Sequence, residues 1–336
     1  MPFIPLKFRP GVNRDTTNYA GEGNWWEMDK IRFLSGFPQK IGGWVKASPD
    51  TFLGTCRNMW NWITTQSDNF LAVGTNLKLY IEVGGNFNDI TPLKEAPTAA
   101  GAVTFAATTG SSIITVLDTA APAEAGNYVT FKDAVSLGGN VTATILNTNH
   151  EIKTVVNSNA YTIEVPVTAN GSDSGNGGAG TIGYYDIDVG GVEASYGYGW
   201  GANGYGLTPW GLGSEVPAVE APRIWWYDNF DNDLVAAIEG GQIYYWERGT
   251  SLSTALTTRA ALMSSFAGAT DVPAQVTQVL VSQQDKHLLA FGAVPYGSSS
   301  VGDFDPLLIR WTNQDQPLNW TPTATNSAGF IRVSRG

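Results

Sequence analysis

The sequence predicts an all-β protein in which a body of β-propeller type is interrupted by a small inserted antiparallel β-sandwich or barrel. Three observations predict this fold: a strand pattern that occurs three times, a sharp change of composition in mid-chain, and a scarcity of helical segments. The 336 residues include 39 glycines and 17 prolines, which leave little room for long helices. The best helical candidate is Ser251–Phe266, where leucines recur among good helix formers.

The repeated unit is an apolar strand, a polar turn, a strand of small and apolar residues, a second turn and an aromatic strand. Its central strands are expected at Asp68–Gly74, Asn232–Ala237 and Lys286–Gly292. The strands before them are expected at Asn58–Ile63, Arg223–Tyr227 and Val276–Val281, and those after them at Lys78–Ile81, Gln242–Trp246 and Leu307–Trp311. This pattern is typical of propeller blades, which must stack because one blade cannot bury both of its faces.

Three further segments indicate how the repeats end and whether another one follows. Asn86–Pro92 closes the first repeat, and a similar phrase, Pro317–Pro322, closes the third. Gly329–Ser334 is predicted to be the opening strand of another unit. Three repeats are fewer than the four blades of the smallest propellers, so the sequence leaves open whether the ring is complete.

Composition changes between Ala96 and Gly183, where aromatic residues become rare and Thr, Val, Ala and Asn dominate. Short, evenly spaced strands in this stretch favour a small antiparallel sandwich or barrel, and Asn170–Gly180 is predicted to be a flexible linker. We therefore expect an N-terminal arm with the first blades at 1–95, an inserted β-domain at 96–183, and the rest of the body with a Gly/aromatic loop at 184–336. The expected strands of the insert are Val103–Thr108, Ile113–Leu117, Tyr128–Lys132, Val141–Leu146, Ile152–Val156 and Tyr161–Val165.

The charge balance limits the class of partner. A net charge of −11 argues against ordinary DNA binding, in which Lys and Arg neutralise phosphates. It is compatible with DNA that slides through a negatively charged channel. No apolar run reaches the ~18 residues of a membrane span, and Lys7, Arg9 and Pro10 interrupt any signal-peptide core, so we expect synthesis and assembly in a cytoplasm.

Residues that could carry chemistry are few. Cys56 is predicted to be a small core thiol, and the two histidines, His150 in a surface turn and His287, support neither a catalytic triad nor zinc. Asp228, Asp231 and Asp233 lie in one turn, but their spacing departs from that of a calcium loop. Asp186 and Asp188 alternate with Ile187 and Val189 along one strand, so both carboxylates are expected on its solvent-exposed face. We predict no enzymatic activity, no catalytic residue, no cofactor and no metal.

The N-terminal region contains four characteristic segments, Pro10–Thr17, Glu22–Trp26, Asp29–Phe33 and Lys40–Trp44. They resemble segments of tail proteins of tailed bacteriophages, most closely of the nozzle or packaged-DNA stabilisation class. The Gly/aromatic stretch Tyr196–Gly201, the Leu71–Gly74 unit, Asp305–Trp311 and the Thr/Val-rich insert fit the same class. Members of that class are typically longer, which leaves open a missing C-terminal part.

The resemblance implies a structural protein of the virion tail, assembled in the host cytoplasm. Six copies would form a ring around the tail channel, retain packaged DNA and conduct it during ejection. The implied partners are further copies, the tail adaptor, tail fibre or spike proteins, and double-stranded DNA in transient non-specific contact.

Six aromatic residues are candidates for subunit contacts, because Trp and Tyr are enriched at interfaces. A packed core position is the simpler alternative for each Trp. The main alternative function is a carbohydrate-binding propeller that acts as a receptor-binding or adhesin module, and a glycosidase is a weaker one. A lectin should repeat one ring with its polar partners in every blade, yet Trp311 stands where the first repeat has Ile81. The six candidates are Trp25, Trp26, Tyr198, Trp200, Tyr205 and Trp210.

Overall fold

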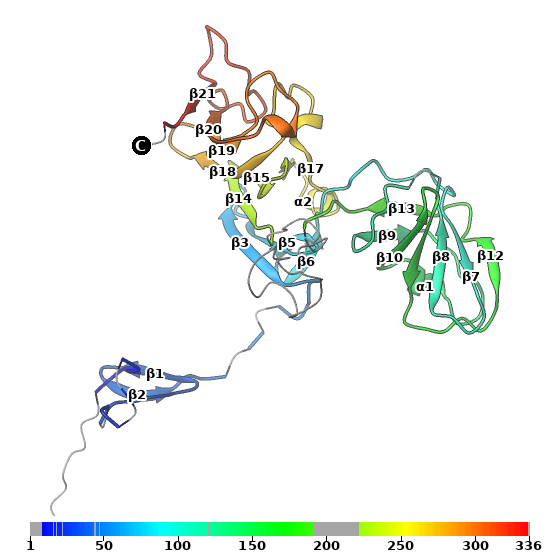
Figure 1. The fold of residues 1–336 in the computed structure, drawn as a ribbon, viewed down its shortest axis with the longest axis horizontal. Helices are drawn as coiled ribbons and strands as arrows, with labels where there is room; N and C mark the ends of the chain where they lie inside the picture. Colours follow the sequence, from blue (N-terminus) through cyan, green and yellow to red (C-terminus); the bar gives the residue numbers. More distant parts are fainter. Residues whose placement is uncertain are drawn as a thin grey trace, which may run out of the picture. The chain divides into compact units, whose positions relative to one another are not determined.

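The computed structural model describes residues 9–334, apart from positions 16, 18, 22, 44, 47 and 120 and the segment 191–221. It separates into two compact units, Met1–Pro49 and Asp50–Gly336, which are described one at a time. The described part is all-β, as predicted, with only short helical turns between its strands (Figure 1).

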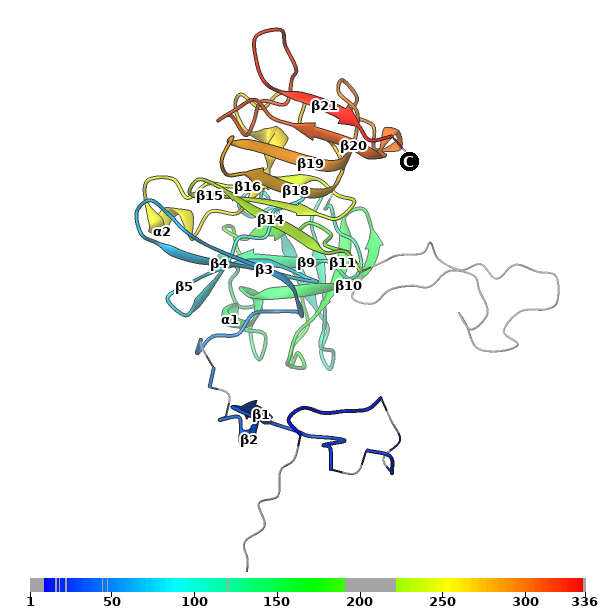
Figure 2. The same cartoon turned by 90° about the vertical axis from the view of Figure 1, so that its left-hand side faces the viewer.

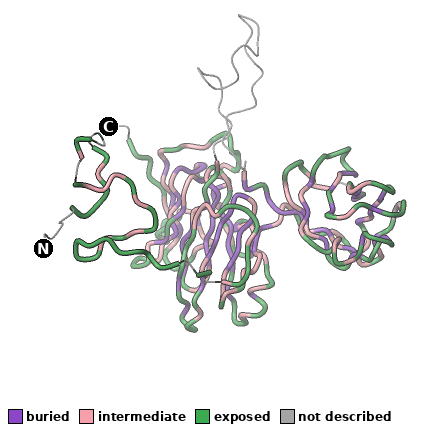
Figure 3. The backbone as a smooth tube through the Cα atoms, turned by 90° about the horizontal axis from the view of Figure 1, so that it is seen from below, coloured by how far each residue is buried: buried purple, intermediate pink, exposed green. Residues whose placement is uncertain are grey.

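The first unit is an extended arm with one hairpin, formed by β1 (Ile31–Leu34) and β2 (Phe37–Lys40). None of its described residues is buried, so the arm has no core of its own (Figure 3). Several of its apolar side chains are largely exposed, including Tyr19 at 96% and Phe37 at 75%. Such exposure is typical of a segment that packs against something else.

The body of the second unit contains three four-stranded antiparallel sheets, each with its strands in chain order. This confirms the propeller-like fold expected from the repeats, and the three sheets are called blades 1, 2 and 3 below. Blade 1 consists of β3 (Cys56–Ile63), β4 (Asn69–Thr75), β5 (Leu79–Val83) and β6 (Asn86–Asp89). Blade 2 consists of β14 (Trp225–Phe230), β15 (Asp233–Ile238), β16 (Ile243–Trp246) and β17 (Ala261–Leu262). Blade 3 consists of β18 (Val276–Ser282), β19 (His287–Ala293), β20 (Asp305–Trp311) and β21 (Gly329–Arg332).

The first strand of each blade is its innermost strand. β14 contacts both β3 and β18 (Figure 2). Each blade's fourth strand lies at the opposite edge of its sheet from the first. This is the radial arrangement of propeller blades around an axis.

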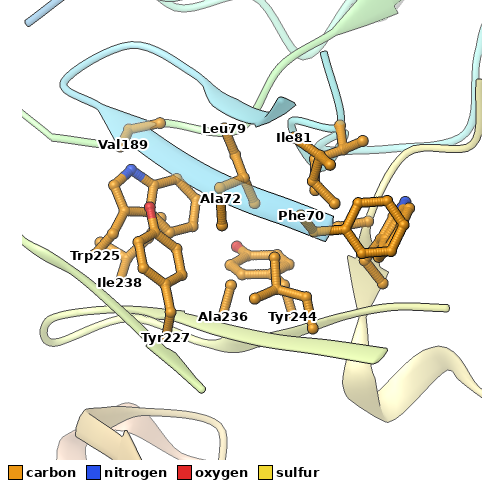
Figure 4. Packing of buried hydrophobic residues seen from close by; sticks show 14 of the residues in the cluster. Phe70, Ala72, Leu79, Ile81, Val189, Trp225, Tyr227, Ala236, Ile238 and Tyr244 are labelled. Carbon is orange, nitrogen blue, oxygen red and sulfur yellow. The ribbon is translucent and has the colours of Figure 1, made fainter. Parts of the chain in front are cut away.

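Adjacent blades bury one apolar core at each junction. Phe70, Ala72 and Leu79 of blade 1 pack on Trp225 and Tyr227 of blade 2 (Figure 4). The opposite face of blade 2 packs on blade 3 in a second core. Large rings give these junctions much buried apolar area per residue. The second core includes Val235, Ala237 and Tyr245 of blade 2 with Val279, Leu288, Ala290 and Trp320 from blade 3 and its loops.

The insert folds as a seven-stranded antiparallel sheet in the order β12-β7-β8-β11-β10-β9-β13. The long strand β10 pairs with β9 through its first residues and with β11 through its last ones, so the two halves of the sheet share one core. Whether residues 96–183 are a separate domain stays a prediction. The elements are β7 (Thr104–Ala107), β8 (Ile113–Leu117), β9 (Tyr128–Lys132), α1 (Ala143–Leu146), β10 (Asn149–Asn157), β11 (Ala160–Glu164), β12 (Asp173–Asn176) and β13 (Ile182–Tyr185).

Several local expectations were wrong. Val141–Leu146 contains the helical turn α1 instead of a strand, and Asn170–Gly180 contains β12, which pairs with β7. Gly329–Ser334 does not open a new unit, because its strand β21 pairs with β20 and completes blade 3. The predicted helix Ser251–Phe266 is reduced to α2 (Leu252–Ala255) and the 3₁₀ turn η1 (Met263–Ser265), and a second 3₁₀ turn, η2 (Val301–Asp303), precedes β20.

Rings of blade 2 lie directly against Gly74 of blade 1, so we predict that this position does not tolerate a larger side chain. A Cβ atom there would lie 1.5 Å from the Tyr227 hydroxyl and 2.5 Å from the Trp225 ring. We expect Gly74→Ala to lower the free energy of unfolding by about 1–3 kcal/mol, because both rings are held in a packed core. Urea unfolding followed by tryptophan fluorescence measures the change. Gly42→Ala is the control, since nothing lies within 4 Å of its Cβ position, and equal midpoints for the two variants would contradict the packing described.

Candidate subunit interface

The junction of blades 1 and 2 shows how sheets of this chain recognise one another. Inner-strand side chains of blade 1 donate hydrogen bonds to blade 2: Asn58 Nδ2 to the Trp225 carbonyl at 2.6 Å, and Trp62 Nε1 to the Asn232 carbonyl at 3.1 Å. Arg248 of blade 2 reaches back to Asp68, in the first turn of blade 1, at 2.6 Å. These polar contacts surround the apolar core and fix the register of the sheets.

The junction of blades 2 and 3 also has polar contacts around its core, but here the inner strand of blade 3 donates back to blade 2. The Val281 backbone N–H donates to Asp228 Oδ2 at 2.7 Å. Lys286, in the first turn of blade 3, forms an ion pair with Asp231, in the first turn of blade 2. Asp233 accepts from the Tyr245 hydroxyl at 2.6 Å and from the Arg248 N–H at 2.8 Å. The three aspartates of this turn therefore each hold a separate protein partner, and no metal-binding group of three or more side chains occurs among the described residues.

A buried ion cluster lies where the insert rejoins the body. Lys78 Nζ is 2.8 Å from Asp89 and 2.6 Å from Asp186, and Arg259 of blade 2 contacts the same two carboxylates at 2.7 and 3.4 Å. Lys78 and Asp186 are each 1% exposed. The prediction that Asp186 faces water was wrong, because its carboxylate turns inward to meet Lys78, whereas Asp188 is exposed.

The surroundings shift the pKa values of the two carboxyl groups of this cluster in opposite directions. Burial acts to raise the pKa of Asp89, but Lys78 and Arg259 outweigh it, so the pKa lies below its usual value. Burial also raises the pKa of Asp186, and there the neighbouring cations offset it only in part. Because both acids and both bases are paired within the cluster, it is built to hold segments together.

The cysteine and the two histidines are partly or fully buried and contact groups of the fold itself. Cys56 is half-buried, and burial raises the pKa of its thiol, which makes the thiolate scarce. His150 does not lie in a surface turn as predicted: it is 5% exposed, and its Nε2 lies 3.1 Å from the Ile145 carbonyl. His287 Nδ1 lies 2.7 Å from the Thr312 carbonyl.

Blade 3 turns an apolar face away from blade 2, and no described sheet covers that face. Strand register places six of its side chains side by side. None of them is fully buried, and Leu280 and Ile331 are 42% and 57% exposed. This blade 3 open face consists of Leu280, Leu289, Phe291, Ile309, Trp311 and Ile331.

Blade 1 has a second such face, on the side opposite blade 2. Met59 and Ile63 are 58% and 68% exposed there, beside Asn61, Leu71 and Glu82. These five residues are called the blade 1 open face. Its outer half is covered by a cluster of aromatic rings. The centroid of the Phe52 ring lies 5.0 Å from that of Phe87 and 6.1 Å from that of Tyr80. The described body therefore ends in two partly exposed sheet faces, an apolar one on blade 3 and one on blade 1 in which apolar residues lie beside Asn61 and Glu82.

The predicted contact residues are placed only in part. Trp25 and Trp26 are half-buried within the arm, where Trp25 packs on Phe33 and the guanidinium of Arg14 lies 6.0 Å from the Trp26 ring. Their role in subunit contacts stays a prediction. The other four candidates, Tyr198, Trp200, Tyr205 and Trp210, lie outside the described residues. The open faces were missed in the sequence because their residues alternate with buried ones along the same strands.

The fold and its junctions define an all-β chain of propeller type whose sheets present further apolar faces. No protein-family model matches the chain, and no curated protein matches it. One similar solved structure is the phage phi92 endosialidase, with 12% sequence identity and a TM-score of 0.23. The match covers 83% of this chain but 36% of that chain, and so low a TM-score does not establish a common fold. In the part of the chain that the structure describes, no helix is long and apolar enough to cross a membrane.

The ion cluster predicts a large effect for loss of its lysine. Lys78→Met leaves Asp186 buried without its nearest cation, so the free energy of unfolding should fall by about 3–5 kcal/mol. Chemical unfolding measures it, and Lys132→Met, at an exposed position, should change little. Adding Asp186→Asn to Lys78→Met should recover part of the loss. No recovery would mean that the lysine acts through its packing and not through its charge.

Proposed function

We propose that the chain is a structural component of a bacteriophage tail, in which several copies form a ring that retains packaged DNA and conducts it during ejection. The resemblance of its N-terminal phrases to the nozzle class supports the tail assignment. The ring of six copies around the channel, and contacts with the tail adaptor and with fibre or spike proteins, belong to the same proposal.

One observation supports an assembling role above the others: no described sheet covers the apolar face of blade 3, or the exposed Met59 and Ile63 on the outer face of blade 1. Monomeric proteins rarely expose contiguous apolar patches of this kind without a binding role. The arm adds exposed apolar side chains of its own, including Phe37. A protein that works as one unit of an assembly accounts for all of these surfaces.

A passage role for DNA fits the charge. The net charge of −11 gives a surface that repels phosphate groups, so a duplex in a channel formed by such subunits would slide without tight binding. We propose no enzymatic activity, because the acidic clusters described above are engaged in ion pairs and hydrogen bonds within the fold.

The carbohydrate-binding alternative has weaker support. At the mid-strand position that faces the next blade, the inner strands carry Trp60, Asp228 and Leu280. Trp60 is itself engaged, since its Nε1 lies 3.3 Å from Asn229 Oδ1. The blades therefore do not repeat one aromatic platform with shared polar partners.

The proposal predicts oligomeric rings in the purified chain. Negative-stain electron microscopy over a wide range of concentrations should show rings whose central hole is at least as wide as a DNA duplex. Monomers at all concentrations, also after addition of tail adaptor protein, would refute the ring. Binding on a glycan array together with such monomers would favour the adhesin alternative.

The arm should contribute to ring formation. Trp25→Ala combined with Trp26→Ala removes two large rings from a segment without buried residues, so we expect fewer rings and an unchanged unfolding midpoint of the body. Light scattering after size-exclusion chromatography measures the first quantity. Tyr296→Ala, which removes a half-exposed ring from blade 3, is the control. Equal ring yields in both variants would exclude the two tryptophans from the interface.

A further inference from the structure

A pocket of about 320 Å³ lies where the insert rejoins the body. Its walls come from the two connections of the insert, at residues 93–94 and 187–188, and from blade 2 with the residue Arg223 that precedes its first strand. Every residue that lines it belongs to the described part of the chain. The volume is within the range of about 300–1,000 Å³ typical of small-molecule sites and far exceeds the ~30 Å³ of one water molecule. The pocket therefore has room for one small organic molecule.

Part of the pocket wall is apolar. Ile187, Ile238 and Leu262 line it, and the same side chains belong to the core between blades 1 and 2 or pack against that core. Leu262 is only half-buried. An aliphatic group of a ligand would cover the apolar surface that remains exposed here, and removal of such surface from water favours binding.

One polar side chain of the wall is buried without a partner. Tyr244 is 6% exposed and lines the pocket (Figure 4), yet its hydroxyl forms no hydrogen bond with any residue that the structure describes. Burial raises the pKa of Tyr244 to about 12, while Arg223 acts to lower it and Asp188 to raise it. The hydroxyl is thus protonated at neutral pH and lies close enough to both charges to be affected by them. A buried donor without a partner is unfavourable, and a ligand in the pocket would supply one.

The charged residues of the pocket are engaged to different degrees. Lys94 pairs with Glu124, which does not line the pocket, at 2.6 Å. Arg223 forms no ion pair with a described carboxylate, and its aliphatic stem packs on Gly190, where a Cβ atom would lie 2.9 Å from Arg223 Cδ. Asp188 Oδ1 accepts a hydrogen bond from the Gly190 N–H at 2.8 Å, and Oδ2 has no partner among the described residues. An open guanidinium and an open carboxylate oxygen therefore accompany the buried hydroxyl.

From this arrangement we propose that the pocket binds a small carboxylic acid that has an amino or hydroxyl group next to its carboxyl group and an apolar side chain. The carboxylate pairs with the Arg223 guanidinium, whose donors match two carboxylate oxygens, and accepts a hydrogen bond from the Tyr244 hydroxyl. The amino or hydroxyl group donates to Asp188, and the side chain lies on the apolar wall. A simple anion would be repelled by Asp188 and a simple cation by Arg223. The site goes beyond the proposed tail function and does not depend on it.

Isothermal titration calorimetry of the full chain tests the class of ligand. Free leucine and 2-hydroxy-4-methylpentanoate should both bind, and the tighter of the two shows whether Asp188 prefers an ammonium or a hydroxyl group. Leucinamide, which lacks the carboxylate, should bind at least about tenfold more weakly, and glycine, which lacks the apolar side chain, should also bind more weakly. Absence of binding by both acids at millimolar concentration would overturn the proposal, and so would equal affinities for leucine and leucinamide.

Conservative variants test the residues of the site. Tyr244→Phe removes the hydroxyl and keeps the ring, so the affinity for leucine should fall by about 3- to 10-fold, while the unfolding midpoint should not fall because no hydrogen bond within the fold is lost. Tyr227→Phe is the matched control: its hydroxyl is also buried without a described partner, but Tyr227 does not line the pocket, so the affinity should not change. Arg223→Gln should remove the preference for leucine over leucinamide. Equal affinities of the Tyr244 and Tyr227 variants for leucine would overturn the proposed site.

Discussion

The structure depends on one constraint: a four-stranded sheet with two apolar faces cannot cover either of them by itself. Blade 2 shows the solution, because one face packs on blade 1 through Tyr227 and Ala236 while the other packs on blade 3 through Val235 and Ala237. Both faces of this sheet are therefore built from small and large apolar residues in alternation. Blades 1 and 3 each satisfy this constraint on one side only among the described residues. Their remaining faces are the strongest physical reason to regard the chain as part of an assembly.

The buried ion cluster explains how a long insert is tolerated between blades 1 and 2. The chain leaves and re-enters the body at one place, since the Ile187 N–H donates to the Pro92 carbonyl at 3.1 Å and the Lys94 N–H to the Tyr185 carbonyl at 2.9 Å. Asp186, at the point of return, is held by Lys78 of blade 1 and Arg259 of blade 2. Breaking one partner of such a cluster is costly because it leaves a buried charge uncompensated. The insert thus begins and ends at a junction that the body itself stabilises, and its own core does not need to contribute to the packing of the blades.

The sequence predicted the three sheets because strand composition and turn residues are local signals. It did not predict which face each residue occupies, because a shift of one residue reverses every side chain of a strand. Ala72 and Ala290 occur in similar phrases, yet Ala72 faces the next blade and Ala290 the previous one. The sequence also did not predict which strands pair. The segment of β21 was predicted to start a new unit, but it pairs with β20 after a long loop. The buried position of Asp186 depends on Lys78, a cation far away in the sequence. The buried position of His150 depends on the Ile145 carbonyl, in a turn whose path no local pattern specifies.

Apolar faces provide affinity but little direction, so the order of the blades must come from the polar contacts at the rim of each junction. In this chain a cation of the next blade meets the acidic first turn of the previous one at both junctions. The other hydrogen bonds differ in direction: inner-strand side chains of blade 1 donate to blade 2, whereas the Val281 N–H of blade 3 donates back to blade 2. Two acidic first turns placed against each other would lack a cation, which costs electrostatic energy at low effective dielectric. The ion pairs of Asp68 with Arg248 and of Asp231 with Lys286 therefore favour one order of the blades over the reverse.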